Sequence, residues 1–152
     1  MPQIQEVISW VKEGDWREFA AFAGPELADL TAWDDKVVLV GDASHALSGA
    51  FGSGAGFAIE DGWVLAQALK YYLNDLHQAL PLFNRIRLPY YSRMYEHLSG
   101  VAGQRMNRER NLGANATYDE RVRAKLFHEG GIDMAWIYRN DIGKVWEHEI
   151  RS

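Results

Sequence analysis

The chain has 152 residues, of which 47% are hydrophobic and 12% aromatic, and this composition predicts one folded domain with its own core. The formal net charge of -5 argues against a nucleic acid as partner, because phosphate binding needs clustered Lys and Arg. There are no cysteines, which excludes disulfide scaffolding, thiolate catalysis and cysteine-ligated metals. No apolar stretch approaches the ~20 residues that cross a bilayer, so we expect a soluble, cytoplasmic protein without a membrane partner.

The first block, residues 1–35, is predicted to contain short helices. Apolar residues at helical spacing predict the first of them, with Ile4, Val7, Ile8 and Val11 on one face. A second short helix is expected from Trp16 to Phe22. After Gly24 and Pro25, one more helical turn is expected over residues 26–30, followed by a polar connector over residues 31–35.

The middle block, residues 36–74, is typical of a strand, a glycine loop and a helix. The apolar run Val37 to Val40 ends at Gly41-Asp42, which predicts a buried strand of a parallel-type sheet. Residues 57–73 are apolar on nearly every helical face, so we expect a helix that is buried on most sides. A lone buried strand leaves backbone groups unpaired, so its neighbours must come from the first block or from another chain.

The last block, residues 75–152, is predicted to be helical. A long helix fits its first part, with Pro81 and Pro89 as kink positions. Helical pattern continues over residues 119–128, breaks at Gly130-Gly131 and returns over residues 132–150. The predicted fold class is therefore α/β and predominantly helical, a single domain over residues 1–152 with one buried strand, a Gly-rich loop and long C-terminal helices.

The segment after the strand has the features of an anion-binding turn. Gly52, Gly54 and Gly56 precede a helix, so backbone N–H groups can approach a ligand closely where the helix N-terminus adds partial positive charge. Asp42, directly after the strand, can accept hydrogen bonds from ligand hydroxyls. Asp42 and His45 are the candidate catalytic residues, although His45 could equally have a structural role in holding the loop. A turn that needs glycine for geometry alone would give the same pattern.

The stretch VVLVGDASHALSGAFGSGAGFAIEDGWVLAQAL closely resembles the GD-motif segment of class A FAD-dependent monooxygenases of the salicylate hydroxylase-like kind. The resemblance implies that Asp42 binds the ribityl chain of FAD and that the glycine loop presents amides to the flavin ring and pyrophosphate. The cofactor-binding residues that it implies are Gly41, Asp42, Gly52, Ser53, Gly54, Ala55 and Gly56. It also implies NAD(P)H as co-substrate and an aromatic or polyketide-like substrate in secondary metabolism.

The chain departs from this family at two points. The family opens with a strand and a GxGxxG turn that bind the ADP part of FAD, and no such turn occurs in this sequence. Ala46 stands where many members carry proline after the histidine. We therefore expect a remnant of the hydroxylase fold that needs a homo-oligomer or a partner chain to complete its site.

Other functions fit parts of the pattern. A cofactor-independent cyclase, isomerase or lyase could use Asp42, His45 and nearby tyrosines as acid–base groups, and a non-catalytic binding or complementation module needs none of them. A serine hydrolase is disfavoured because Phe51 stands where the nucleophile elbow around Ser53 needs glycine. No metal site is predicted, because the remaining histidines are widely spaced, namely His77, His97, His128 and His148.

Overall fold

The computed structural model describes residues 2–12, 14–15, 22–47, 49, 51–113, 115–126 and 135–152. These residues are predominantly helical with one small sheet, as the sequence predicts. The helices are α1 (Pro2–Ser9), α2 (Asp42–His45), α3 (Gly54–Tyr71), α4 (Leu76–Leu112), α5 (Tyr118–Leu126), α6 (Ala135–Tyr138) and α7 (Ile142–Arg151). The strands are β1 (Thr31–Ala32) and β2 (Val37–Val38). Among the described helices, none combines the length and the apolar character that a membrane span requires.

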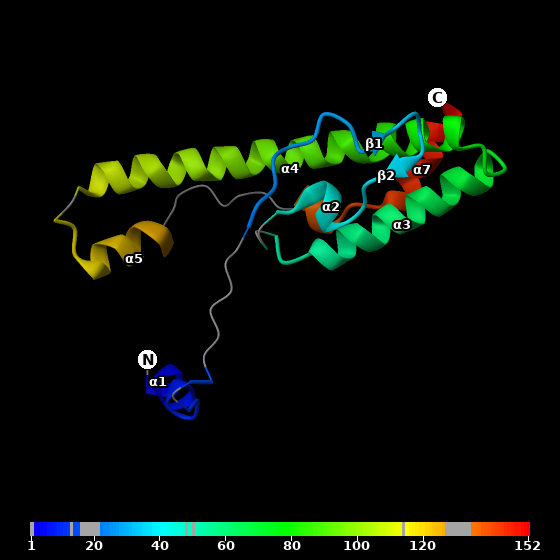
Figure 1. The fold of residues 1–152 in the computed structure, drawn as a ribbon. Helices are drawn as coiled ribbons and strands as arrows, with labels where there is room; N and C mark the ends of the chain where they lie inside the picture. Colours follow the sequence, from blue (N-terminus) through cyan, green and yellow to red (C-terminus); the bar gives the residue numbers. More distant parts are fainter. Residues whose placement is uncertain are drawn as a thin grey trace.

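The body of the molecule is a helical hairpin formed by α3 and α4 (Figure 1). The chain reverses at Leu73 and Asn74, which have φ of 53° and 66°, and the N–H of Asn74 bonds the Leu69 carbonyl at 2.7 Å. The Asp75 side chain then caps α4 by accepting from the N–H of His77. Helix α7 contacts both arms of the hairpin, and β1 contacts α4. The far part of α4 extends beyond α3, and α5 turns back beside it (Figure 1).

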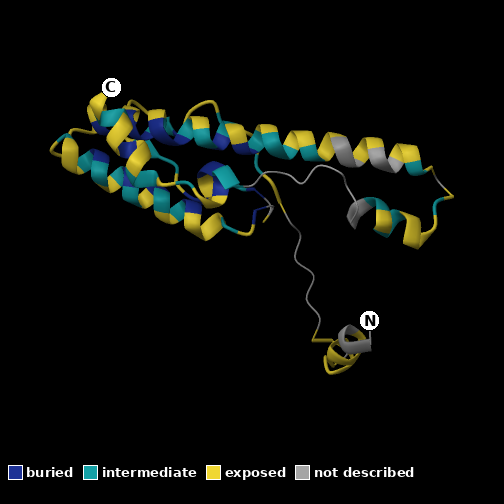
Figure 2. Cartoon of the chain, turned by 180° about the vertical axis from the view of Figure 1, so that it is seen from behind, coloured by how far each residue is buried: buried dark blue, intermediate teal, exposed yellow. Residues whose placement is uncertain are grey.

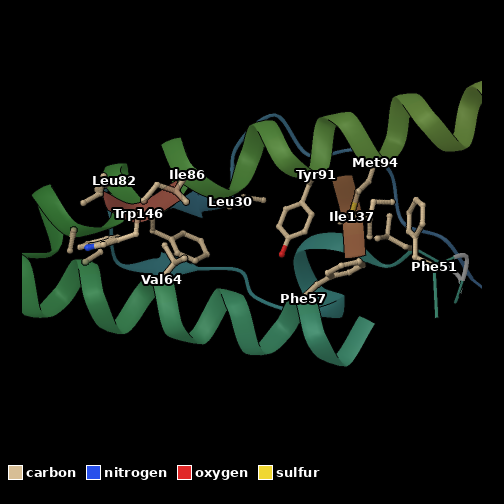
Figure 3. Close-up of a cluster of buried hydrophobic side chains, with 14 residues drawn as sticks. Leu30, Phe51, Phe57, Val64, Leu82, Ile86, Tyr91, Met94, Ile137 and Trp146 are labelled. Atoms are coloured by element: carbon tan, nitrogen blue, oxygen red, sulfur yellow. The ribbon is translucent and has the colours of Figure 1, made fainter. Parts of the chain in front are cut away.

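The hydrophobic core fills the space between α3 and α4 (Figure 3). Helix α7 contributes Trp146 and helix α6 contributes Ile137, and the two close the layer from one side. The fully buried apolar side chains at its centre come from both arms of the hairpin and are Val64, Ala68, Ala79, Phe83 and Met94. One continuous core therefore holds the four helices together.

The predicted strand is present, but its pairing is different from the prediction. Val37 and Val38 pair antiparallel with Ala32 and Thr31, and both valines are only half-buried, so a buried strand of a parallel sheet was wrong. The reason is the turn over residues 33–36, where Trp33, Asp34 and Asp35 each have φ of 56° and bring the chain straight back. The strand that pairs with β2 is therefore β1 of the first block, which was one of the two expected sources.

Two further local predictions differ from the structure. Residues 26–30 form no helical turn, because hydrogen bonds to distant residues hold the segment in an irregular conformation. Leu30 donates its N–H to the Asn84 side chain at 2.9 Å, and Gly24 donates its N–H to the Ala46 carbonyl at 2.8 Å. The connector over residues 31–35 contains β1. The helix expected from Trp16 to Phe22 and the break at Gly130-Gly131 fall on segments that lie largely or wholly outside the described residues.

Helix α3 is buried on one face, not on most sides as predicted (Figure 2). Its buried residues follow one another at three- and four-residue steps and are Phe57, Asp61, Val64 and Ala68. Ile59, on another face, is 73% exposed. The physical reason is that α4 and α7 pack against α3 from the same side.

We predict that Phe83→Ala destabilises the protein by about 3–5 kcal/mol, because the ring is fully buried and its loss leaves a cavity in the core. Urea unfolding followed by circular dichroism measures this loss. Ile59→Ala is the control and should change the free energy of unfolding by less than about 1 kcal/mol, since Ile59 is largely exposed. Equal losses in the two variants would contradict the position of the core between α3 and α4.

Candidate functional site

A cavity of about 310 Å³ lies where α2, the glycine loop and the start of α3 meet. Its walls are partly apolar, with Phe22, Leu47, Phe51 and Phe57. The polar and small residues that line it are Asp42, His45, Ala46, Gly49, Gly52, Gly54 and Ala55. The cavity is large enough for a ring-sized ligand.

Local backbone geometry positions this cavity. Gly41 has φ of 57°, and a Cβ there would come within 3.2 Å of the Ala58 Cβ, so both the turn and the close packing on α3 require glycine. The Gly41 carbonyl then accepts hydrogen bonds from the N–H groups of Ser44 and His45 and from the Ser44 hydroxyl, which forms α2. Gly52 has φ of 64° and turns the chain into α3.

The N-terminus of α3 opens onto the cavity through Gly54 and Ala55. The first N–H groups of a helix have no acceptor within the helix, and the Ser53 side chain does not cap this one. These amides and the helix dipole favour a negatively polarised group in front of them. The arrangement can therefore bind an anion or a polarised carbonyl.

The structure brings together some of the predicted site residues and separates others. Asp42, His45, Gly52, Gly54 and Ala55 all line the cavity, and Asp42 is exposed at its edge. The other predicted residues do not line it: Gly41, Ser53 and Gly56. Gly41 is buried behind α2, and Ser53 donates its hydroxyl to the Phe51 carbonyl at 3.3 Å. That any of them binds flavin stays a prediction.

Behind the cavity lies a fully buried carboxylate, Asp61. Its Oδ2 accepts from the Gly41 N–H at 2.8 Å and lies 3.0 Å from the Nε2 of His45. Its Oδ1 accepts from the Nε of Arg87 at 2.8 Å and from the Tyr91 hydroxyl. Asp61 thus connects the end of the β2 segment, α2, α3 and α4 through one side chain.

Arg87 extends this network across the hairpin. It donates to Glu60 at 2.9 Å, to the Tyr91 hydroxyl at 2.7 Å and to the Phe57 carbonyl at 3.4 Å. Its side chain is fully buried, while Glu60 is partly exposed. Buried charges persist only when they are paired and hydrogen-bonded, and both conditions hold here.

The network changes the acidity of its members. Burial would raise the pKa of Asp61, but hydrogen bonds from His45, Tyr91 and Gly41 and the Arg87 charge outweigh burial and hold this pKa below 3.8. Burial would lower the pKa of Arg87, yet Tyr91 and Asp61 raise it above its ordinary value. Burial raises the pKa of Tyr91 well above its ordinary value. The pair therefore stays ionised and the phenol stays neutral.

Sequence reasoning missed this network. None of the four side chains Glu60, Asp61, Arg87 and Tyr91 was among the predicted site residues. The available signal was that Glu60 and Asp61 are the only formal charges from Ala43 to Leu69, and two carboxylates in such an apolar segment need a cation. Arg87 supplies the cation, and Tyr91, four residues further along the same face of α4, adds a hydroxyl donor.

His45 is held between rings. Its imidazole stacks on Tyr91 with centroids 4.2 Å apart, and it meets the edge of Phe57 at 6.1 Å. The side chain has no exposed surface. The structural role that the sequence left open for His45 is visible, because the ring ties α2 to Asp61 of α3. Among the described residues, no cluster of three or more His, Asp or Glu side chains is arranged to hold a metal.

Comparison with known proteins shows a similarity to a hydroxylase. The chain is 32% identical over 88 residues to a 3-hydroxybenzoate 6-hydroxylase of Polaromonas naphthalenivorans (strain CJ2). The match covers 57% of this chain and 21% of that protein, so the chain spans about a fifth of the relative's length. No family model and no solved structure matches. The similarity agrees with the resemblance to hydroxylases that the GD-motif segment shows.

We predict that Arg87→Leu destabilises the protein by about 3–5 kcal/mol, because it leaves the Asp61 charge buried without its cation. Arg85→Leu is the matched control on the same helix. Arg85 pairs with Glu149 but is 58% exposed, so its loss should cost less than about 1 kcal/mol. Urea unfolding of both variants makes the comparison, and similar losses would contradict the buried network.

We also predict that the stability contributed by ionised Asp61 depends on pH. Its pKa is lowered in the folded state, so this contribution is present above about pH 5 and is lost as the pH falls through the folded-state pKa. The gap in unfolding free energy between wild type and Asp61→Asn should therefore shrink as the pH drops from about 6 to about 3. Asp34→Asn, at an exposed carboxylate, is the control. A gap that stays constant over this range would refute the assignment.

Proposed function

We propose that this chain carries the flavin-facing side of an FAD-dependent monooxygenase-like site that acts on an aromatic or polyketide-like small molecule. The observation that supports it best is the cavity at the uncapped N-terminus of α3, with the Asp42 carboxylate at its edge. The resemblance of the GD-motif segment and the similarity to a 3-hydroxybenzoate 6-hydroxylase point in the same direction.

The chemistry of the cavity residues fits this role. The Gly54 and Ala55 amides and the helix dipole stabilise negative charge, as develops on the reduced flavin ring. Asp42 would accept hydrogen bonds from the ribityl hydroxyls. The apolar walls formed by Phe51 and Phe57 exclude water from one side. When bound, FAD would supply the oxygen chemistry after reduction by NAD(P)H. The residues of this chain would orient the substrate and stabilise negative charge on the flavin ring.

The size of the cavity argues for a second contributor. About 310 Å³ accommodates part of a flavin but not the whole dinucleotide, whose ADP portion needs its own phosphate-binding turn. We therefore propose that a second copy of the chain or a partner protein supplies the remaining contacts.

A second candidate function is supported by His45. His45 is one of the residues that line the cavity, and its imidazole is hydrogen-bonded to a buried carboxylate, which is the arrangement of an acid–base group that would serve a cofactor-independent cyclase, isomerase or lyase. Turnover without flavin or nicotinamide would favour this second function. A non-catalytic binding or complementation module would show ligand or partner binding with no turnover.

We predict that the purified chain perturbs the visible spectrum of added FAD and that Asp42→Ala weakens this binding about tenfold, since the lost hydrogen bonds involve a charged acceptor. Asp34→Ala, an exposed acid outside the cavity, should bind as the wild type does. Absorbance titration measures both affinities, and the mass in solution with and without FAD reports on oligomers. No spectral change at any FAD concentration, or equal affinity in the two variants, would contradict the proposed site.

A further inference from the structure

His45 carries an unused hydrogen-bonding atom. His45 is one of the residues that line the cavity, and its side chain has no exposed surface, yet Nδ1 has no hydrogen-bond partner in the part of the chain that the structure describes. A buried polar atom without a partner costs free energy, because it has lost its water and gained nothing in return. Such an atom beside a cavity calls for a ligand group.

The partner of the other ring nitrogen determines what Nδ1 can do. Nε2 lies 3.0 Å from the Oδ2 of Asp61, whose ionised carboxylate only accepts hydrogen bonds. Nε2 must therefore carry the proton. In the neutral ring this leaves Nδ1 as an acceptor with a free lone pair.

The surroundings hold this tautomer and this orientation. Asp61 is fixed by the Gly41 N–H at 2.8 Å and by Arg87 at 2.8 Å, so its carboxylate cannot turn away from the imidazole. Tyr91 stacks on the ring with centroids 4.2 Å apart. Figure 3 shows Tyr91 and Phe57 reaching from α4 and α3 toward the same space. The ring is thus pre-oriented by groups that belong to the fold.

We propose that Nδ1 of His45 faces the cavity as a hydrogen-bond acceptor, set by Asp61, and that the cavity takes a ligand with a donor group beside an apolar ring. The ring is inferred from the Phe22, Phe51 and Phe57 walls, and the donor from the lone pair of Nδ1. This goes beyond the proposed function, because it concerns a positioning residue and a ligand group and does not require flavin.

Phenol and anisole form a matched pair of probes. Both present a ring to the apolar walls, but only phenol has a hydroxyl to donate. Wild-type protein should bind phenol about tenfold more tightly than anisole, because phenol donates a hydrogen bond to Nδ1 and anisole leaves this atom unsatisfied. In His45→Phe, which keeps a stacking ring but has no acceptor, the preference should fall to about onefold to twofold. His77→Phe makes the same change at a 65% exposed histidine and should keep the wild-type preference.

Nitrogen-15 NMR of the histidine rings tests the tautomer without any variant in the cavity. The ligand-free protein should show His45 protonated at Nε2 and unprotonated at Nδ1, and phenol should shift the Nδ1 signal. Asp61→Asn should allow the proton to move to Nδ1 in a measurable fraction of molecules. Circular dichroism checks that each variant is folded.

Several results would overturn the inference. These are a proton on Nδ1 in the wild type, equal binding of phenol and anisole, binding of neither, or a phenol preference that survives in His45→Phe. Failure of FAD binding in the separate titration would remove the proposed function while leaving this inference intact. Conversely, FAD binding together with equal affinities for phenol and anisole would refute this inference and would still support the flavin site.

Discussion

The structure depends on one buried carboxylate, that of Asp61. It has no exposed surface, so an uncompensated charge there would cost several kcal/mol of stability. Compensation requires two separate segments to meet at this carboxylate. One is α2 with Gly41 and His45 at its ends, and the other is α4 with Arg87 and Tyr91. Because the network contains hydrogen bonds of fixed geometry, it specifies one arrangement of α2, α3 and α4 more sharply than apolar packing would.

The cavity is a consequence of that arrangement. Gly41 and His45 stand at the two ends of α2, and Asp61 holds both, so the short helix cannot shift relative to α3. Arg87 also contacts the Phe57 carbonyl in the first turns of α3. The end of α3 that opens onto the cavity is therefore anchored from behind, which leaves its leading amides free to face a ligand in front.

The sequence predicted what depends on local pattern and missed what depends on distant partners. Periodicity identified the long helix α4 despite Pro81 and Pro89. The closely spaced glycines identified the loop before α3. It could not show that Val37-Val38 pairs antiparallel, because a turn built from three positive-φ residues without glycine has no clear sequence signal. Nor could it show that Arg87 lies opposite Asp61, since the two residues are 26 positions apart and the chain reverses between them at Leu73 and Asn74.

The electrostatics of the site limit what it can bind. Arg87 balances the charge of Asp61 behind the cavity, so a ligand meets mainly hydrogen-bonding groups and the edge carboxylate of Asp42. The leading amides of α3 donate, whereas Asp42 and, in the proposed orientation, Nδ1 of His45 accept. A simple anion such as phosphate satisfies the amides but is repelled by Asp42 and has little to donate to His45. A neutral ring that bears an acceptor on one edge and donors on another can bond both the donating amides and the accepting groups. In the proposed orientation, the cavity therefore favours this kind of ligand over a free anion.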